Sequence, residues 1–115
     1  MNGLLKGELG FQGYVMSDWA ATHSGVDSIL SGLDMDMPGG GEAAVGFSDF
    51  LLSGTNDTSF FGGNVTAAVN NGSITEDRVD DMIRRIMTPY FFLGQDKDFP
   101  PIDGAAYGLN YWNGE

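Results

Sequence analysis

The sequence contains no cysteine and few basic residues, and both absences limit what the protein can be. Without cysteine there is neither a disulfide framework nor a thiolate metal site, although the compartment stays open because many secreted proteins lack disulfides. Only 5 lysines and arginines stand against 16 aspartates and glutamates, which gives a net charge of −11. Phosphate backbones and anionic lipid repel such a chain, so we expect no nucleic-acid partner and no membrane partner.

Long apolar runs are also missing. No stretch approaches the ~18 residues that a membrane span needs. The first residues lack the basic and apolar regions of a signal peptide, so we expect either an intracellular protein or a chain whose Met1 is an internal methionine. The 18 glycines and a hydrophobic content of 42% favour one folded domain, or a piece of one, with many tight turns.

The order of the apolar patterns predicts an α/β fold. We expect a short amphipathic helix over residues 3–9, a buried strand over 14–17, a helix over 22–32 and an alternating strand over 33–37. A strand, a helix and a second strand in this order form a βα unit that leads into the next strand.

The second half of the sequence predicts a long loop followed by helices. The loop covers residues 38–62, and a short helix over 64–71 follows it. The clearest helical periodicity then continues to Gly94, with a kink or an early stop predicted near Pro89. Residues 95–115 are typical of a linker that leaves a domain.

Capping residues predict where two of these helices begin. Ser24 and Asp27 have the spacing of a capping-box variant. Thr75 can N-cap the last helix, where Glu76 and Asp77 suit the positive end of the helix dipole.

A carboxylate and a large aromatic residue follow the first predicted strand. In a parallel α/β protein, the strand ends open into the loops that bind substrate. Asp18 is therefore the candidate catalytic residue, and Trp19 is a candidate platform for a flat substrate face. The alternative is that Asp18 is an ordinary cap or turn residue and that Trp19 belongs to the core.

Other polar residues carry weaker signals. The single histidine, His23, cannot build a multi-histidine metal site and is better explained as an exposed or capping residue. Asp34 and Asp36 form a D-x-D pattern that could hold a divalent metal, but their alternation is more simply explained by a polar strand face. Three further aspartates are expected on a helix surface, paired with nearby arginines: Asp77, Asp80 and Asp81 with Arg78, Arg84 and Arg85.

Three N-x-[ST] sequons begin at Asn56, Asn64 and Asn71. A single sequon arises easily by chance, whereas three in a short chain favour a secreted eukaryotic glycoprotein. We therefore expect these three asparagines to be glycosylation sites.

Most of the chain resembles glycoside hydrolase family 3, especially the fungal extracellular β-glucosidases. The resemblance lies in five segments that occur in the family's order: Asn2–Lys6, Glu8–Trp19, Gly32–Gly39, Asn64–Gly72 and Arg78–Met87. The sequence departs from the family over residues 42–61, which look longer than the usual loop. Phe60-Phe61-Gly62 also stands where the family has an aromatic residue, Trp and Gly.

The resemblance implies an incomplete (β/α)₈ barrel. Residues 1–94 would be the last part of the family's N-terminal barrel domain, and 95–115 the linker to the next domain. Asp18 matches the catalytic nucleophile and Trp19 the aromatic wall of the sugar subsites. The acid/base glutamate comes from the following domain, outside this chain.

The implied activity is hydrolysis of terminal β-D-glucosyl residues from cellobiose, cello-oligosaccharides and aryl glucosides, by a retaining mechanism without cofactor or metal. The protein would be secreted, with its signal peptide outside this chain. The 115 residues alone would be poorly folded and inactive, because a barrel closes only with all its strands. Two alternatives stay open: a non-catalytic acidic secreted glycoprotein, and a metal-dependent glycosyltransferase that uses Asp34 and Asp36.

Overall fold

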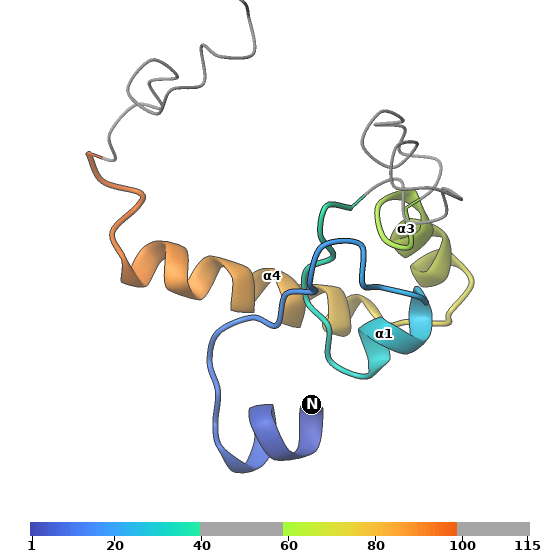
Figure 1. Ribbon diagram of the computed structural model, residues 1–115, viewed down its shortest axis with the longest axis horizontal. Coiled ribbons are helices and arrows are strands. Elements are labelled where there is room, and N and C mark those ends of the chain that lie inside the picture. The colour runs from blue at the N-terminus through green and yellow to red at the C-terminus, as the bar shows by residue number, and fades with distance from the viewer. Residues whose placement is uncertain (40–58, 99–115) are drawn as a thin grey trace, which may run out of the picture.

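The computed structural model of the protein describes residues 1–39 and 59–98 (Figure 1). Its helices are η1 (Asn2–Glu8), α1 (Val26–Leu30), α3 (Gly63–Asn70) and α4 (Glu76–Phe92). The long helix α4 crosses the structure, and α1 and α3 lie near its N-terminal half. Most of the loop expected over 38–62 and of the linker expected over 95–115 lies outside the described residues.

Two extended segments on either side of α1 lie side by side. Met16 and Met35 form a parallel bridge. The Met35 N–H donates to the Val15 carbonyl at 3.1 Å, and the Ser17 N–H donates to the Met35 carbonyl at 3.0 Å. Parallel segments joined through a helix are the βα arrangement that the sequence predicted.

The full strands expected over 14–17 and 33–37 are not formed. Within the described residues, the pairing is limited to the isolated bridge between Met16 and Met35. Extended ladders gain stability from further strands on both sides. The residue pattern therefore correctly predicted two paired segments, but it wrongly predicted that each forms a full strand.

A small apolar cluster joins the helices. Ile29 of α1 is 1% exposed and is the centre of a cluster that reaches α3 and α4. Its buried members are Ile29, Leu33, Phe61, Ala68, Ile74 and Met82. This cluster holds α1 in place and thereby places the loop that precedes it.

Helix α1 is shorter than predicted, and its expected capping box is absent. The helix begins after Gly25, and no side chain bonds to its first N–H groups. The Ser24 hydroxyl instead lies 2.7 Å from the Ser28 hydroxyl, one helical turn further on. A competing side-chain partner thus takes the oxygen that would have capped the helix.

The predicted N-terminal helix forms over Asn2–Glu8 as a wide π-type turn with no buried residue. Leu4 is 63% and Leu9 is 70% exposed, so the apolar face that the pattern predicted has no partner among residues 1–39 and 59–98. Gly10 follows with a φ of +64°, as expected for a residue that ends a helix.

Helix α4 begins as predicted and ends later than the proline indicated. The Thr75 hydroxyl accepts the Arg78 N–H at 3.3 Å, which is the expected N-cap. The early stop near Pro89 is wrong, because α4 continues to Phe92. A proline deletes only its own N–H, and the Leu93 N–H still donates to the Pro89 carbonyl at 2.9 Å. Gly94, with a φ of +67°, follows this end.

Several apolar side chains of α4 stay exposed. Ile83, Phe91 and Phe92 are 53%, 58% and 87% exposed. No helix among the described residues is long and apolar enough to cross a membrane. Apolar side chains thus stay uncovered both in the middle of α4 and at its C-terminal end.

Candidate active site

Asp18 lies directly beyond the paired segment and keeps an exposed carboxylate. Its Oδ1 accepts the Trp19 N–H at 2.6 Å, and its carbonyl accepts the Ala21 N–H at 3.2 Å. Ala20, between them, has a φ of +58°. The chain therefore turns sharply directly after Asp18, where the paired segment ends.

The turn after Asp18 is fixed to the neighbouring segment. The Ala20 N–H donates to the Met37 carbonyl at 2.9 Å. The Met37 N–H donates to the Ser17 hydroxyl at 2.8 Å. Residues on both sides of Asp18 are thus bonded to the 33–37 segment, so its backbone is held while its carboxylate faces outward.

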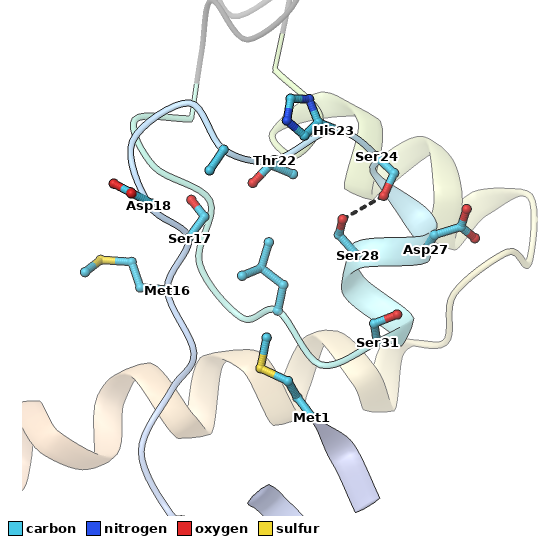
Figure 2. A pocket seen from close by; sticks show the side chains of 12 residues that line it. Met1, Met16, Ser17, Asp18, Thr22, His23, Ser24, Asp27, Ser28 and Ser31 are labelled. Carbon is cyan, nitrogen blue, oxygen red and sulfur yellow. Dashed lines mark hydrogen bonds between the residues drawn. The ribbon is translucent and has the colours of Figure 1, made fainter.

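Asp18 lines an open pocket of about 430 Å³ between its own segment and α1 (Figure 2). Met16 and Asp18 project to the same side of their segment, as residues two apart in an extended chain do. Hydroxyl groups line the opposite wall, namely those of Thr22, Ser24, Ser28 and Ser31. The pocket is therefore lined by two exposed carboxylates, Asp18 and Asp27, beside several hydroxyl groups that can donate or accept hydrogen bonds.

Trp19 and His23, which the sequence analysis also singled out, lie near Asp18. Trp19 is 54% exposed, so residues 1–39 and 59–98 do not bury it. His23 is exposed and lines the same pocket, just before α1. This position agrees with the expectation of an exposed residue close to a helix start.

The D-x-D pair, predicted to form a polar strand face, is buried. Asp34 and Asp36 do share one side of their segment, but they are only 2% and 7% exposed. The Asp34 Oδ1 contacts Lys6 Nζ at 2.7 Å and an Arg78 terminal nitrogen at 2.9 Å. Its Oδ2 accepts the Val15 N–H at 2.9 Å. These partners occupy both oxygens, which leaves Asp34 unsuited to metal binding.

Residues 1–39 and 59–98 contain no group of three or more His, Asp or Glu side chains placed to hold a metal ion. The D-x-D interpretation as a glycosyltransferase metal site therefore has no support from these side chains.

Of the three aspartates predicted to pair with arginines on α4, Asp80 and Asp81 form ion pairs, and Asp77 forms none within residues 1–39 and 59–98. Asp81 contacts Arg78 and Arg85 at 2.9 Å each, and the exposed Arg84 lies 3.7 Å from Asp80. Arg78, however, points inward and reaches Asp34. Sequence reasoning missed this buried cluster because no local pattern shows that a helix arginine meets an aspartate 44 residues earlier.

Two of the three sequons lie in the described residues. Asn64 is exposed, and its amide nitrogen donates to the Ser59 carbonyl at 2.5 Å. Asn71 is exposed after α3, and its Oδ1 accepts the Ser73 N–H at 2.9 Å. Asn56 lies outside the described residues.

Comparison with known proteins gives a consistent set of relatives. The chain is 66% identical over 110 residues to a probable β-glucosidase G of Emericella nidulans, which covers 96% of this chain and 13% of the relative. It is 63% identical over 111 residues to a probable β-glucosidase G of Aspergillus terreus, again with 96% and 13% coverage. No protein-family model matches the sequence.

Solved structures agree with these relatives. A β-glucosidase from Chaetomella raphigera matches with a TM-score of 0.73 and 39% identity, over 88% of this chain and 12% of that structure. A glycoside hydrolase family 3 β-glucosidase from Neurospora crassa matches with a TM-score of 0.70 and 47% identity, over 90% and 11%.

The chain is thus a homologue of one segment of the fungal glycoside hydrolase family 3 β-glucosidases, as the sequence resemblance indicated. It spans 13% of the length of each of these two β-glucosidase G relatives.

Proposed function

We propose that the chain is a segment of a longer retaining β-glucosidase and that Asp18 is its catalytic nucleophile. The observation that supports this most directly is the contrast between the firmly bonded backbone around Asp18 and its exposed carboxylate. The relatives are named β-glucosidases, which supports a glucoside as the substrate.

In this proposal, a carboxylate oxygen of Asp18 attacks the anomeric carbon and forms a glycosyl–enzyme bond while the bond to the leaving group breaks. A second carboxyl group, roughly 5 Å away, protonates the leaving oxygen and later removes a proton from the attacking water. That second group is a glutamate of the following domain, outside this chain. Trp19 supports a face of the sugar next to Asp18.

The proposed architecture is the end of a (β/α)₈ barrel over residues 1–94, followed by a linker over 95–115. The parallel pairing of Met16 with Met35 across α1 supports it, since successive barrel strands are parallel and joined by helices. Asp18 then stands at the C-terminal end of its strand, where barrel enzymes place their active sites.

We also propose that the protein is secreted and that it carries glycans at Asn56, Asn64 and Asn71. The exposure of Asn64 and Asn71 supports this, because a glycan needs a surface position. Intact masses before and after deglycosylation would test the number of glycans. A mass that does not change on treatment would contradict it.

The experiment that tests the nucleophile uses the full-length protein and an activated 2-fluoroglucoside, which traps the glycosyl–enzyme. We expect one added fluoroglucosyl unit on the peptide that contains Asp18, and none in the Asp18→Asn variant. The matched control is Asp27→Asn, an exposed carboxylate of the same pocket, which should still be labelled. Labelling of another residue, or of Asp18→Asn, would contradict the assignment.

A further inference from the structure

A charged group is completely buried near the centre of the described structure. The Asp34 side chain is 0% exposed, and the Lys6 and Arg78 side chains that contact it are 5% and 13% exposed. A buried carboxylate is tolerated only when partners compensate its lost hydration. Here two cations and one backbone N–H do so.

These partners come from three separate parts of the chain. Lys6 belongs to η1, Arg78 to α4, and the Val15 N–H to the segment that leads to Asp18. Arg78 also donates to the carbonyls of Ile29 and Leu33, at 3.0 and 2.8 Å. One carboxylate thus connects two helices to the segment that carries the proposed nucleophile.

The bond to Val15 makes this cluster relevant to Asp18. The Val15 carbonyl accepts the Asp34 and Met35 N–H groups, at 2.9 and 3.1 Å. Its own N–H donates to the Asp34 carboxylate. Both polar groups of Val15 are therefore bonded to the neighbouring segment, three residues before Asp18. Loss of the carboxylate would release one of these two attachments.

We infer that Asp34 is a positioning residue, which acts through the Val15 N–H to hold Asp18 at the distance that attack requires. This inference rests on the proposed role of Asp18. A displacement of a reacting group by about 1 Å can cost roughly 100-fold in rate. Because the Asp34 side chain is completely buried, we expect its loss to change kcat more than KM.

The test compares two double variants of the full-length protein that have the same charge. Lys6→Met with Asp34→Leu removes one cation, the anion and the acceptor for Val15. Lys6→Met with Asp34→Asn removes the same charges but keeps an amide oxygen of similar size that can accept the Val15 N–H. In both variants Arg78 keeps its bonds to Asp81 and to the two carbonyls.

We expect the leucine variant to lose about 10- to 100-fold in kcat on an aryl β-glucoside, with KM within about threefold of wild type. The asparagine variant should recover most of that loss. Equal losses in both variants would show that charge and not the Val15 bond is responsible, and wild-type kcat in the leucine variant would show no role. Either result overturns the inference.

Two controls separate this inference from the proposed function and from misfolding. A wild-type protein without glucosidase activity contradicts the proposed function, whereas an active wild type with unchanged variants contradicts only the role of Asp34. Arg84→Met, which alters an exposed ion pair of α4, should leave kcat unchanged. If the double variants do not fold, hydrogen exchange of the Val15 N–H in the wild-type protein tests the inference instead. Slow exchange at Val15 supports the inference, and rapid exchange contradicts it.

Discussion

At the scale of single residues, two aspartates 16 positions apart have opposite surroundings. The Asp34 carboxylate is buried and bonded on both oxygens, so it can only fix structure. The Asp18 carboxylate is exposed, and its Oδ1 accepts the N–H of the next residue. The same side chain is thus a structural anchor in one place and a candidate nucleophile in the other, because burial and partners differ.

The arginines of α4 allow a matched test of the buried cluster. Arg78→Met leaves the buried Asp34 with one cation fewer and should destabilise the domain by roughly 3 kcal/mol, because a buried charge loses a partner. Arg84→Met breaks an exposed pair and should cost no more than about 0.5 kcal/mol.

Thermal unfolding of the two full-length variants would show the difference. A clear fall in the unfolding temperature is expected for Arg78→Met and almost none for Arg84→Met. Equal effects in the two variants would mean that the Asp34 cluster contributes nothing special to stability.

At the scale of elements, helix α4 is the part that connects the rest. Its buried residue Met82 belongs to the core, Arg78 contacts Asp34, and Arg85 donates to the Phe11 carbonyl at 2.6 Å. The helix therefore holds the segment that leads to Asp18 from two positions. Thr75 caps the helix, and this fixed start determines the directions in which Arg78 and Arg85 project.

The N-cap of α4 can be tested directly. Thr75→Ala removes the hydroxyl that accepts the Arg78 N–H and should destabilise the fold by about 1 kcal/mol. Thr75→Ser keeps the hydroxyl and should stay close to wild type. Denaturant unfolding of the full-length variants measures both. Equal stability of the alanine and serine variants would show that the cap contributes little.

At the scale of the whole molecule, the described residues cover few apolar groups. The apolar core has six buried members, whereas Leu4, Leu9, Phe91 and Phe92 each remain at least 58% exposed. The relatives are far longer than this chain. We attribute the exposed faces to contacts with the remainder of the proposed barrel.

The isolated 115-residue chain should therefore be inactive on β-glucosides and prone to association. Exposed apolar faces and unpaired segments favour aggregation, and one catalytic carboxylate cannot complete a retaining mechanism. Binding of a hydrophobic dye and sedimentation would show the association. Glucoside hydrolysis by the purified 115-residue chain, lost in Asp18→Asn, would overturn this expectation.

Local patterns in the sequence predicted helices α3 and α4 and singled out the candidate nucleophile. The periodicity around Met82 and the hydroxyl of Thr75 predicted α4, because helix period and capping depend on neighbouring residues alone. The apolar run before Asp18 predicted that this carboxylate stands where an extended segment ends. The family resemblance could also be recognised from the sequence alone, since it depends only on the order of residues.

Only the tertiary structure decided how distant residues meet. It buried Asp34 between Lys6 and Arg78, which the alternation with methionines did not reveal. It also left Ser24 bonded to Ser28 and not to the start of α1. These outcomes depend on which charged groups and hydroxyls the fold brings together. Burial removes their hydration, and this cost is offset only where the groups find hydrogen-bond or ion-pair partners.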